Sequence, residues 1–295
     1  MVLPRSRMQQ FARLPRSWRL LRAFPLEQQQ PAVFYRLLAN DTATLLSLLW
    51  EKHHPAGMSR FATAANAGAG SVSANFENRD PLAGLKILDV GGGPGWFAAA
   101  FSDRGASYYS VEPDHAELAA TGSPTSPCIR ARGEALPFAD NSFDLVYSSN
   151  VVEHTPTPWA MADEMLRVVK PGGLMVLSYT VWLGPFGGHE TGLIPHYIGG
   201  EFARRRYERR HGHPPKNVFG QSLFAVSAAA GLRYAKHARR NGTELVAAFP
   251  RYHPWWAWPV VHIPVVREFL TSNLVLVFAK PVAETSQADG VSRVK

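Results

Sequence analysis

The residues best suited to chemistry form a glycine-rich segment, which reads Leu88-Asp89-Val90-Gly91-Gly92-Gly93-Pro94-Gly95-Trp96. It follows an apolar run and precedes a helical pattern. Glycines let a backbone approach a ligand closely, and the N–H groups that open the next helix remain free to bind it. Glu112 ends the next apolar run, 21 positions after Gly91, where a carboxylate can accept both hydroxyls of a ribose. The pattern therefore predicts a site for a cofactor that contains a nucleoside.

The spacing of the glycines discriminates between two such cofactors. A dinucleotide fingerprint, G-x-G-x-x-G, that starts at Gly91 needs a glycine at position 96, where this chain has Trp96. The alternative pattern D-x-G-x-G-x-G is complete, with Asp89, Gly91, Gly93 and Gly95. The spacing favours S-adenosyl-L-methionine over a dinucleotide.

Three further segments follow the glycine loop in order, GEALPFADNSFD at 133–144, SNVVEH at 149–154 and LRVVKPGG at 166–173. Together with the loop they resemble the type 11 family of class I methyltransferases, and the resemblance covers about residues 85–180. It implies a Rossmann-like fold and S-adenosylmethionine-dependent methyl transfer. It says little about the N-terminal residues or about the segment after the fifth predicted strand.

The resemblance also implies roles for individual residues. Asp89 would orient the glycine turn and help to hold the amino group of the cofactor, and Glu112 would bind its ribose. The remaining implied cofactor contacts are Gly91, Gly92, Gly93, Gly95, Pro113, Glu134, Ala135 and Asn150. One departure is that family members often carry Asp-Ala-Glu where this chain has Arg132-Gly133-Glu134, so backbone N–H groups would replace an aspartate at the adenine.

Methyl transfer to an oxygen requires loss of a proton, and three histidines are candidate bases. The family motif places His154 near the pocket, although it can equally hydrogen-bond within the fold. His189, beside Glu190, and His196 lie in the segment 181–220, which interrupts the strand and helix pattern. The spacing of the histidines and acids matches no metal-ligand pattern, so we expect no metal.

Apolar runs and helical patterns alternate over most of the chain. Strands are predicted at 86–90, 108–111, 128–131, 143–148, 174–180, 244–249 and 274–279, and helices at 31–50, 95–102, 159–169 and 223–230, the last ended by Gly231. This alternation is typical of an α/β fold with a doubly wound, Rossmann-like sheet of seven strands. The sheet is expected to be mostly parallel, with an antiparallel last strand.

Three parts of the chain are predicted. Residues 1–80 form a basic, helical N-terminal extension and lid, residues 81–281 form the methyltransferase domain, and residues 282–295 form a flexible tail. Within the domain, residues 181–220, here called the cap, follow the fifth strand. Ligands of open α/β sheets bind at the carboxyl ends of the strands, so the cap is expected to contact the substrate.

Charge and composition narrow the choice of partner. The net charge of +8 is concentrated at residues 1–30, which carry +5, and at residues 201–216, which carry +4. A tryptophan-rich run at 252–259 adds a signal for a lipid interface, so an anionic membrane surface is a candidate partner, and burial of the tryptophans is the alternative. A single cysteine, no signal pattern and no apolar run long enough to span a bilayer predict a cytoplasmic protein, or one that is peripheral at a membrane.

The predicted acceptor is a small molecule or a lipid-like molecule, methylated at oxygen. Nucleic-acid methylation is an alternative that the net positive charge suggests, but no Asn-Pro-Pro-Tyr motif follows the fourth strand. A second alternative is a regulator that binds S-adenosylmethionine without turnover. The identity of the acceptor and the oligomeric state stay open.

Overall fold

The computed structural model describes residues 6–55, 79–119 and 128–282. The predicted tail therefore lies almost wholly outside the described residues, as does most of the loop predicted between residues 53 and 80. None of the helices in these three ranges is long and apolar enough to cross a membrane.

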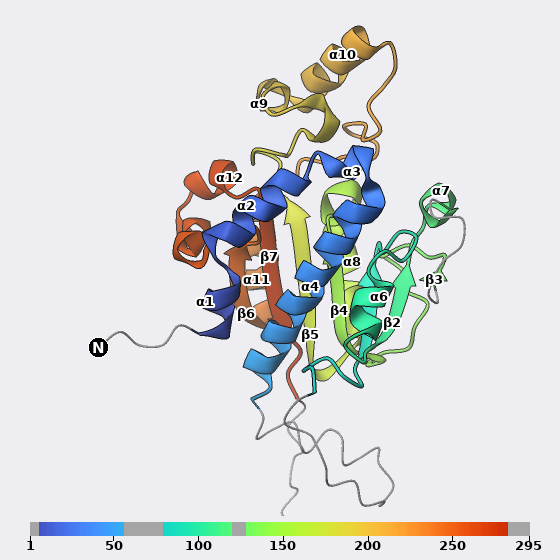
Figure 1. Cartoon of the computed structure of the whole chain (residues 1–295), viewed down its shortest axis with the longest axis vertical. Coiled ribbons are helices and arrows are strands. Elements are labelled where there is room, and N and C mark those ends of the chain that lie inside the picture. The colour runs from blue at the N-terminus through green and yellow to red at the C-terminus, as the bar shows by residue number, and fades with distance from the viewer. Residues whose placement is uncertain (1–5, 56–78, 120–127, 283–295) are drawn as a thin grey trace, which may run out of the picture.

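A single seven-stranded sheet forms the centre of the molecule (Figure 1). Its strands are β1 (Lys86–Val90), β2 (Ser107–Val111), β3 (Cys128–Ile129), β4 (Phe143–Ser149), β5 (Val169–Thr180), β6 (Glu244–Pro250) and β7 (Asn273–Ala279). The order is β3-β2-β1-β4-β5-β7-β6, and only β7 runs antiparallel to its neighbours. The predicted fold class is confirmed, including the antiparallel last strand.

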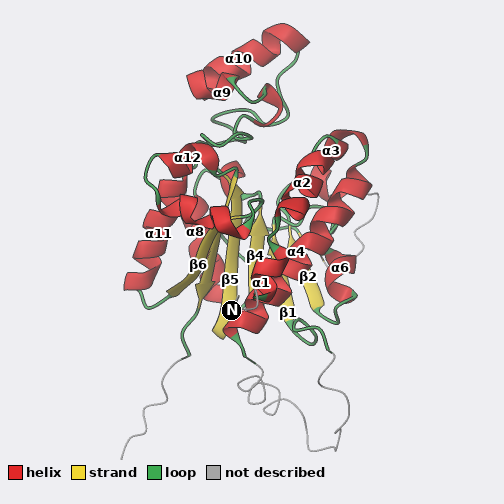
Figure 2. Cartoon of the chain, turned by 60° about the vertical axis from the view of Figure 1, so that its left-hand side comes forward, coloured by secondary structure: helices red, strands yellow, loops and turns green. Residues whose placement is uncertain are grey.

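Helices cover both faces of the sheet, as Figure 2 shows. One layer contains α4 (Pro31–His53) and α6 (Ala98–Ser102), and the other contains α8 (Pro158–Val168) and α11 (Ala228–Arg240). Side chains alternate along β7, so that Val275 and Val277 join one core while Leu276 and Phe278 join the other. This period of two explains why the strands read as continuous apolar runs, since both faces are buried.

Strand β5 begins five residues before the predicted start at position 174. Phe143 pairs with Val169 and Leu145 with Leu174, so an irregularity in register absorbs the Pro-Gly-Gly segment within the strand. The sequence indicated a turn there because proline and glycine normally end strands. Proline and glycine are also tolerated at a β-bulge within a strand, as here.

Helix α11 differs most from the prediction. A helix at 223–230 with a stop at Gly231 is wrong, because α11 begins at Ala228 and continues to Arg240. The Ser227 hydroxyl caps it by accepting a hydrogen bond from the Ala230 N–H. Gly231 lies in the helix interior, where a Cβ would stand 2.2 Å from the Tyr179 hydroxyl oxygen. The glycine thus permits close packing on β5 and does not end the helix.

Four helices make up the N-terminal part, α1 (Arg7–Phe11), α2 (Leu14–Ala23), α3 (Leu26–Gln29) and α4. Pro15 lies in the first turn of α2, a position where its missing N–H costs nothing. A buried ion pair between Arg16 and Asp41 joins α2 to α4, with two contacts of 2.7 Å. These contacts hold α2 and α3 near the carboxyl ends of the parallel strands.

Short helices follow the strands at the same end of the sheet. They are η2 (Val152–His154), η3 (His189–Thr191), α9 (Pro195–Ile198), α10 (Gly200–His211), η4 (Trp255–His262) and α12 (Val266–Leu270), and α7 (His115–Ala119) follows β2. Figures 1 and 2 both show α9 and α10 beyond the end of the sheet. The segment predicted as a cap therefore projects over the edge at which ligands bind in this type of fold.

Candidate functional site

A cavity of about 1290 Å³ opens at the carboxyl ends of β1, β2 and β4. The glycine loop after β1 forms its floor, and α3 and α4 form one wall. Segments that follow β4 and β5 complete it. The lining residues that the argument below uses are Phe24, Phe34, Asp89, Gly91, Gly92, Gly93, Glu112, Pro113, Glu134, Asn150, His154, Phe186, His189, Glu190 and Tyr252.

Two glycines of the loop leave no room for a side chain. A Cβ on Gly91 would lie 2.3 Å from a Val151 methyl carbon, and one on Gly92 would lie 2.8 Å from the Ser110 Cβ. Gly91 also has a φ of +83°, which disfavours other residues. Gly95 lies outside the cavity lining and shapes the turn, because its N–H donates to the Gly92 carbonyl. The loop is thus a cradle that brings backbone close to a ligand.

Glu112 holds this cradle from β2. Its Oε2 accepts the Gly93 N–H at 3.2 Å, and its Oε1 accepts the Asp114 N–H at 3.1 Å. Burial raises the pKa of Glu112 above its ordinary value, and these two hydrogen bonds oppose the rise. Each carboxylate oxygen can accept another hydrogen bond, so the carboxylate can bind two ribose hydroxyls, and Pro113 lines the cavity beside it.

Asp89 is almost fully buried beneath the loop and bonds to two tyrosines. The Tyr108 and Tyr147 hydroxyls both donate to its Oδ2, at 2.7 and 2.5 Å. Burial raises the pKa of Asp89 to about 7, although the tyrosine hydrogen bonds lower it in part. This arrangement fits the expected role of orienting the glycine turn, because the carboxylate is fixed from two strands.

The adenine side departs from the expectation at two residues. Glu134 lines the cavity, but its Oε1 accepts the Thr155 hydroxyl at 2.6 Å, which turns the carboxylate toward η2. Burial raises the pKa of Glu134, but hydrogen bonds from Thr155, its own backbone N–H and Thr157, together with the Arg132 charge, outweigh burial and leave the pKa below its ordinary value. Ala135 does not line the cavity, and its N–H donates to the Arg132 carbonyl. The Ala135 amide therefore is not free to replace an aspartate at the adenine.

Asn150 follows β4 in a left-handed conformation, with a φ of +58°. Asparagine tolerates this conformation better than most residues. Its N–H donates to the Ser178 carbonyl at 2.7 Å, and its Oδ1 accepts the Asn273 side-chain amide at 2.7 Å. Asn150 lines the cavity near the glycine loop, and its implied contact with the cofactor stays a prediction.

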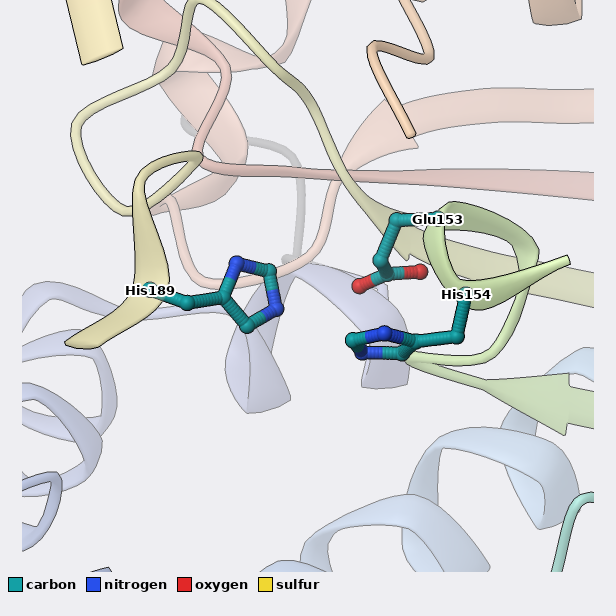
Figure 3. Close-up of side chains that lie close together, drawn as sticks. All are labelled: Glu153, His154 and His189. Atoms are coloured by element: carbon teal, nitrogen blue, oxygen red, sulfur yellow. The ribbon is translucent and has the colours of Figure 1, made fainter. Parts of the chain in front are cut away.

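The three histidine candidates have different surroundings. His154 and His189 line the cavity, and Figure 3 shows that their rings approach each other beside the Glu153 carboxylate. His196 is a correction, because it is buried within the cap against Trp182 and is absent from the cavity lining. Burial lowers its pKa, which is typical of a packed, neutral histidine.

His189 and the adjacent Glu190 bond to different partners. Glu190 Oε1 accepts the side-chain amide of Asn217 at 2.6 Å, and His189 Nδ1 bonds to the Gly187 carbonyl at 3.2 Å. Adjacent residues in a turn point in different directions, so neighbours in the sequence did not become partners. The acid that lies close to both cavity histidines is instead Glu153, which the sequence did not single out as a site residue.

Known proteins resemble this chain along most of its length. A family model described as a methyltransferase domain matches residues 88–177. An uncharacterized methyltransferase of Mycobacterium marinum is 55% identical over 273 residues, which cover 91% of this chain and 95% of that protein. An uncharacterized methyltransferase of Mycolicibacterium gilvum is 54% identical over 270 residues, covering 90% and 94%. The chain belongs to the methyltransferase family.

Among solved structures, an S-adenosylmethionine-dependent methyltransferase of Mesorhizobium loti aligns with a TM-score of 0.45 at 20% identity, over 67% of this chain and 91% of that one. The family implies S-adenosylmethionine as the cofactor of this methyltransferase. The residues present fit it, since the cradle excludes side chains at Gly91 and Gly92 and Glu112 keeps acceptor capacity.

The N-terminal helices contribute site residues that sequence reasoning did not name. Phe24, in the turn between α2 and α3, and Phe34 of α4 line the cavity, and Phe24 stacks on Phe186 of the cap with ring centroids 5.0 Å apart. Tyr35 stacks on Trp96, the residue that distinguished the cofactor, at 5.4 Å. The apolar spacing predicted that these helices pack on the domain. It could not show which side chains face the ligand.

Arg251 is a second residue that the sequence did not indicate. It is buried at the end of β6, where it donates to the Ser149 hydroxyl at 2.7 Å and to the Ser178 hydroxyl at 3.1 Å. Its carbonyl accepts a hydrogen bond from Arg16 at 3.0 Å. Arg251 thereby connects the ends of β4 and β5 to the N-terminal helices of this methyltransferase.

Proposed function

We propose that this methyltransferase transfers the methyl group of S-adenosylmethionine to an oxygen atom of a small or lipid-like acceptor. The observation that supports the proposal is a single cavity, which joins the glycine cradle, two histidines and an aromatic wall. The sulfonium of S-adenosylmethionine supplies a methyl group that is already activated. The protein then has to align the acceptor oxygen behind that carbon and exclude water.

The aromatic wall supports an apolar acceptor. Phe24, Phe34, Phe186 and Tyr252 line the cavity together, and Tyr252 meets Phe24 edge to face with centroids 5.8 Å apart. Aromatic side chains bury large apolar areas at small entropic cost, which suits a ring or an acyl chain. We propose on this basis that residues 1–80 act as a lid and that residues 181–220 act as the substrate cap.

The two cavity histidines support oxygen as the acceptor atom. The Ser222 carbonyl lies 2.7 Å from His154 Nδ1 and can only accept, so this nitrogen carries the hydrogen. His189 Nδ1 donates to the Gly187 carbonyl in the same way. In the neutral form each Nε2 then keeps a lone pair toward the cavity. As the new C–O bond forms and the C–S bond breaks, the hydroxyl proton can pass to such a nitrogen.

A lipid-like acceptor also agrees with the surface around the cavity. Helices α2, α9, α10 and α12, together with η4 and the residues beside them, carry exposed apolar side chains, here called the rim surface. It comprises Leu14, Trp18, Leu21, Leu193, Ile194, Tyr197, Ile198, Phe202, Trp256, Ile263, Val265, Val266, Phe269 and Leu270. Exposed apolar side chains that gather at one end of a protein are typical of protein or membrane interaction sites. We propose that the rim surface contacts an anionic bilayer.

Nucleic-acid methylation is less well supported. In the 201–216 cluster, Arg204 is ion-paired with Glu201 and Glu208, and Arg205 is ion-paired with Glu201. Pairing within one helix reduces the charge available to phosphates.

The function is tested with methyl-labelled S-adenosylmethionine. The protein is incubated with separated lipid, polar and nucleic-acid extracts, and label is expected in the lipid or polar fraction as an ester or ether. Label in nucleic acid would replace the proposed acceptor class. Binding of S-adenosylhomocysteine with no label in any fraction would favour a regulator without turnover. A His154→Ala variant should keep cofactor binding and lose transfer.

A further inference from the structure

Glu153, His154 and His189 form a cluster of metal-ligand side chains on the acceptor side of the cavity. One donor atom from each residue lies within 4.8 Å of the donor atoms of the other two. Glu153 and His154 belong to η2 after β4, and His189 begins η3 after β5. Figure 3 shows the two imidazole edges facing each other with the carboxylate beside the space between them.

The carboxylate of Glu153 lacks a countercharge within the described residues. Its side chain is only 1% exposed. Its Oε1 accepts the Thr180 N–H at 2.9 Å, whereas its Oε2 has no hydrogen-bond partner in the described part of the chain. Burying a carboxylate is costly unless it is paired with a cation or a donor. The free oxygen points to a missing positive group.

Both histidines are oriented as metal ligands are. A metal-bound histidine usually donates its other ring N–H to a carbonyl or carboxylate, which fixes the ring and its tautomer. His154 does so through Nδ1 to Ser222, and His189 does so through Nδ1 to Gly187. In addition, the Phe224 N–H donates to the backbone carbonyl of Glu153 at 2.8 Å. The segment at 222–224 therefore supports both the His154 ring and the backbone of η2.

We propose that Glu153, His154 and His189 bind one divalent first-row transition-metal ion. Two imidazole nitrogens and one carboxylate oxygen suit Zn²⁺, Co²⁺, Mn²⁺ or Fe²⁺ better than Mg²⁺ or Ca²⁺, which prefer oxygen ligands. Bonds of about 2.0 to 2.2 Å place the ligands of a tetrahedral ion about 3.4 Å apart, so the cluster contracts by roughly an ångström on binding. Rotation of His189 at the start of η3 can supply this movement.

The ion would have positions left that face the cavity. An acceptor with one or two oxygen atoms could fill them, and a hydroxyl that binds a divalent cation loses its proton to solvent more readily. With the ion bound, this effect replaces the histidine base, because the Nε2 lone pairs of His154 and His189 are then bound to the metal. For the proposed oxygen methylation, the ion would favour acceptors whose own oxygen atoms can bind it, such as a phenol beside a second oxygen. The role of the ion in methyl transfer rests on the proposed function, whereas binding of the ion does not.

The ion-binding test uses the full chain, stripped of metal by a chelator and titrated with Co²⁺ alone. Ligand-field absorption and calorimetry should report one site per chain. His189→Ala and Glu153→Gln should each weaken Co²⁺ binding by at least about 100-fold, since loss of an orienting group alone costs about 10- to 100-fold. Mg²⁺ at the same concentration should not displace the ion.

A matched control removes two other histidines. His211 and His213 are exposed and their rings lie 6.1 Å apart, so a double substitution to alanine tests whether any histidine pair binds Co²⁺. This variant should bind as the parent does. Absence of Co²⁺ binding to the parent would overturn the metal site. So would His189→Ala and Glu153→Gln variants that bind Co²⁺ as tightly as the parent does. Retained S-adenosylhomocysteine binding in those variants separates that result from failure of the methyltransferase function.

Discussion

At the residue scale, the glycine loop depends on one carboxylate. Glu112 accepts the N–H groups of Gly93 and Asp114 and keeps capacity for two ribose hydroxyls. A hydrogen bond to a charged group contributes about 1.5 to 3 kcal/mol. We therefore expect Glu112→Ala to raise the dissociation constant of S-adenosylhomocysteine by about 10- to 150-fold in calorimetry. Glu112→Gln, with a single acceptor oxygen, should give an intermediate value.

The control for Glu112 is Asp103→Ala, which removes an exposed carboxylate after α6 and away from the cavity. It should leave the dissociation constant unchanged. Equal affinity of the parent and Glu112→Ala would remove Glu112 from the cofactor site. The parent should bind S-adenosylhomocysteine and should not bind NAD, because Trp96 stacks on Tyr35 at the position where a dinucleotide loop has glycine.

The buried Asp89 predicts a pH dependence of stability. Burial raises its pKa from 3.8 to about 7, so between these values the folded protein keeps a proton that the unfolded chain has lost. The free energy of unfolding therefore falls as pH rises through this window. Asp89→Asn keeps an acceptor for both tyrosine hydroxyls but cannot ionise. The variant should gain stability relative to the parent, on the order of a few kcal/mol, between pH 4 and pH 7.

Urea unfolding without cofactor, at several pH values from 4.5 to 8, measures this difference. The gain should level off above about pH 7, where Asp89 is ionised in both states. A difference that stays constant over the whole range would show that Asp89 has an ordinary pKa in the folded protein.

At the level of single residues, the sequence predicted the cofactor side better than the acceptor side. Asp89, Gly91 and Glu112 lie in one motif and at the end of the next strand, so the topology alone brings them together. The acceptor side combines His154 with His189, which are 35 positions apart and belong to two separate short helices, η2 and η3. No periodicity relates such residues, and the buried Glu153 resembled an ordinary polar residue after a strand.

At the element scale, Gly231 provides a test of how α11 packs. Alanine in place of glycine normally stabilises a helix by about 1 kcal/mol. Here the added Cβ would stand 2.2 Å from the Tyr179 hydroxyl oxygen and 3.0 Å from a Leu276 methyl carbon. Overpacking costs about 1 to 3 kcal/mol. We expect Gly231→Ala to lower the free energy of unfolding despite its better helix propensity.

A double-mutant cycle identifies the cause. In a Tyr179→Phe background the hydroxyl is absent, so Gly231→Ala should be less destabilising there than in the parent. Urea denaturation of the four proteins gives the coupling energy. A stabilising Gly231→Ala with no coupling to position 179 would indicate that α11 does not pack closely on β5.

The elements themselves were predictable to different degrees. Strands β1, β4 and β7 coincide with apolar runs because both faces of the sheet are buried. Helix α11 was misplaced because a glycine that permits close packing has the same sequence signature as a glycine that ends a helix. Only the contact with Tyr179 distinguishes the two, and that contact comes from a strand about 50 residues earlier.

At the scale of the whole molecule, the N-terminal helices and the cap meet over the cavity. Arg16 pairs with Asp41 and donates to the Arg251 carbonyl, so the extension is tied to the sheet by buried charges. Phe24 stacks on Phe186 from the cap side. Removal of one partner from a buried ion pair is strongly destabilising, because the other charge is left buried and unpaired. The extension is therefore part of the site in this structure.

The rim surface lies at the same end of the molecule as the cavity. Figures 1 and 2 show α2, α9 and α12 near the carboxyl ends of the parallel strands, and the cavity opens at those ends. Tyr197 of α9 stacks on Phe269 of α12 at 6.2 Å, which joins two of its parts. The run at 252–259 contains three tryptophans, Trp255, Trp256 and Trp258. Of these three, only Trp256 is well exposed, and Trp258 packs on Phe249. Burial thus accounts for Trp258 and leaves α9 and α12 as the main apolar contributors.

Vesicle sedimentation tests the proposed bilayer contact of the rim surface. Exposed arginines on α2 and α10 should each contribute about 1 kcal/mol near an anionic leaflet, so binding to vesicles with anionic lipid should exceed binding to neutral ones and fall with salt. Ile194→Ser with Ile198→Ser should weaken it further, because these side chains are 71% and 67% exposed. Val282→Ser is the matched control, since Val282 is also 71% exposed but follows β7 at the opposite end of the sheet. Equal loss in both variants, or no binding of the parent at low salt, would leave the acceptor to reach the cavity from solution.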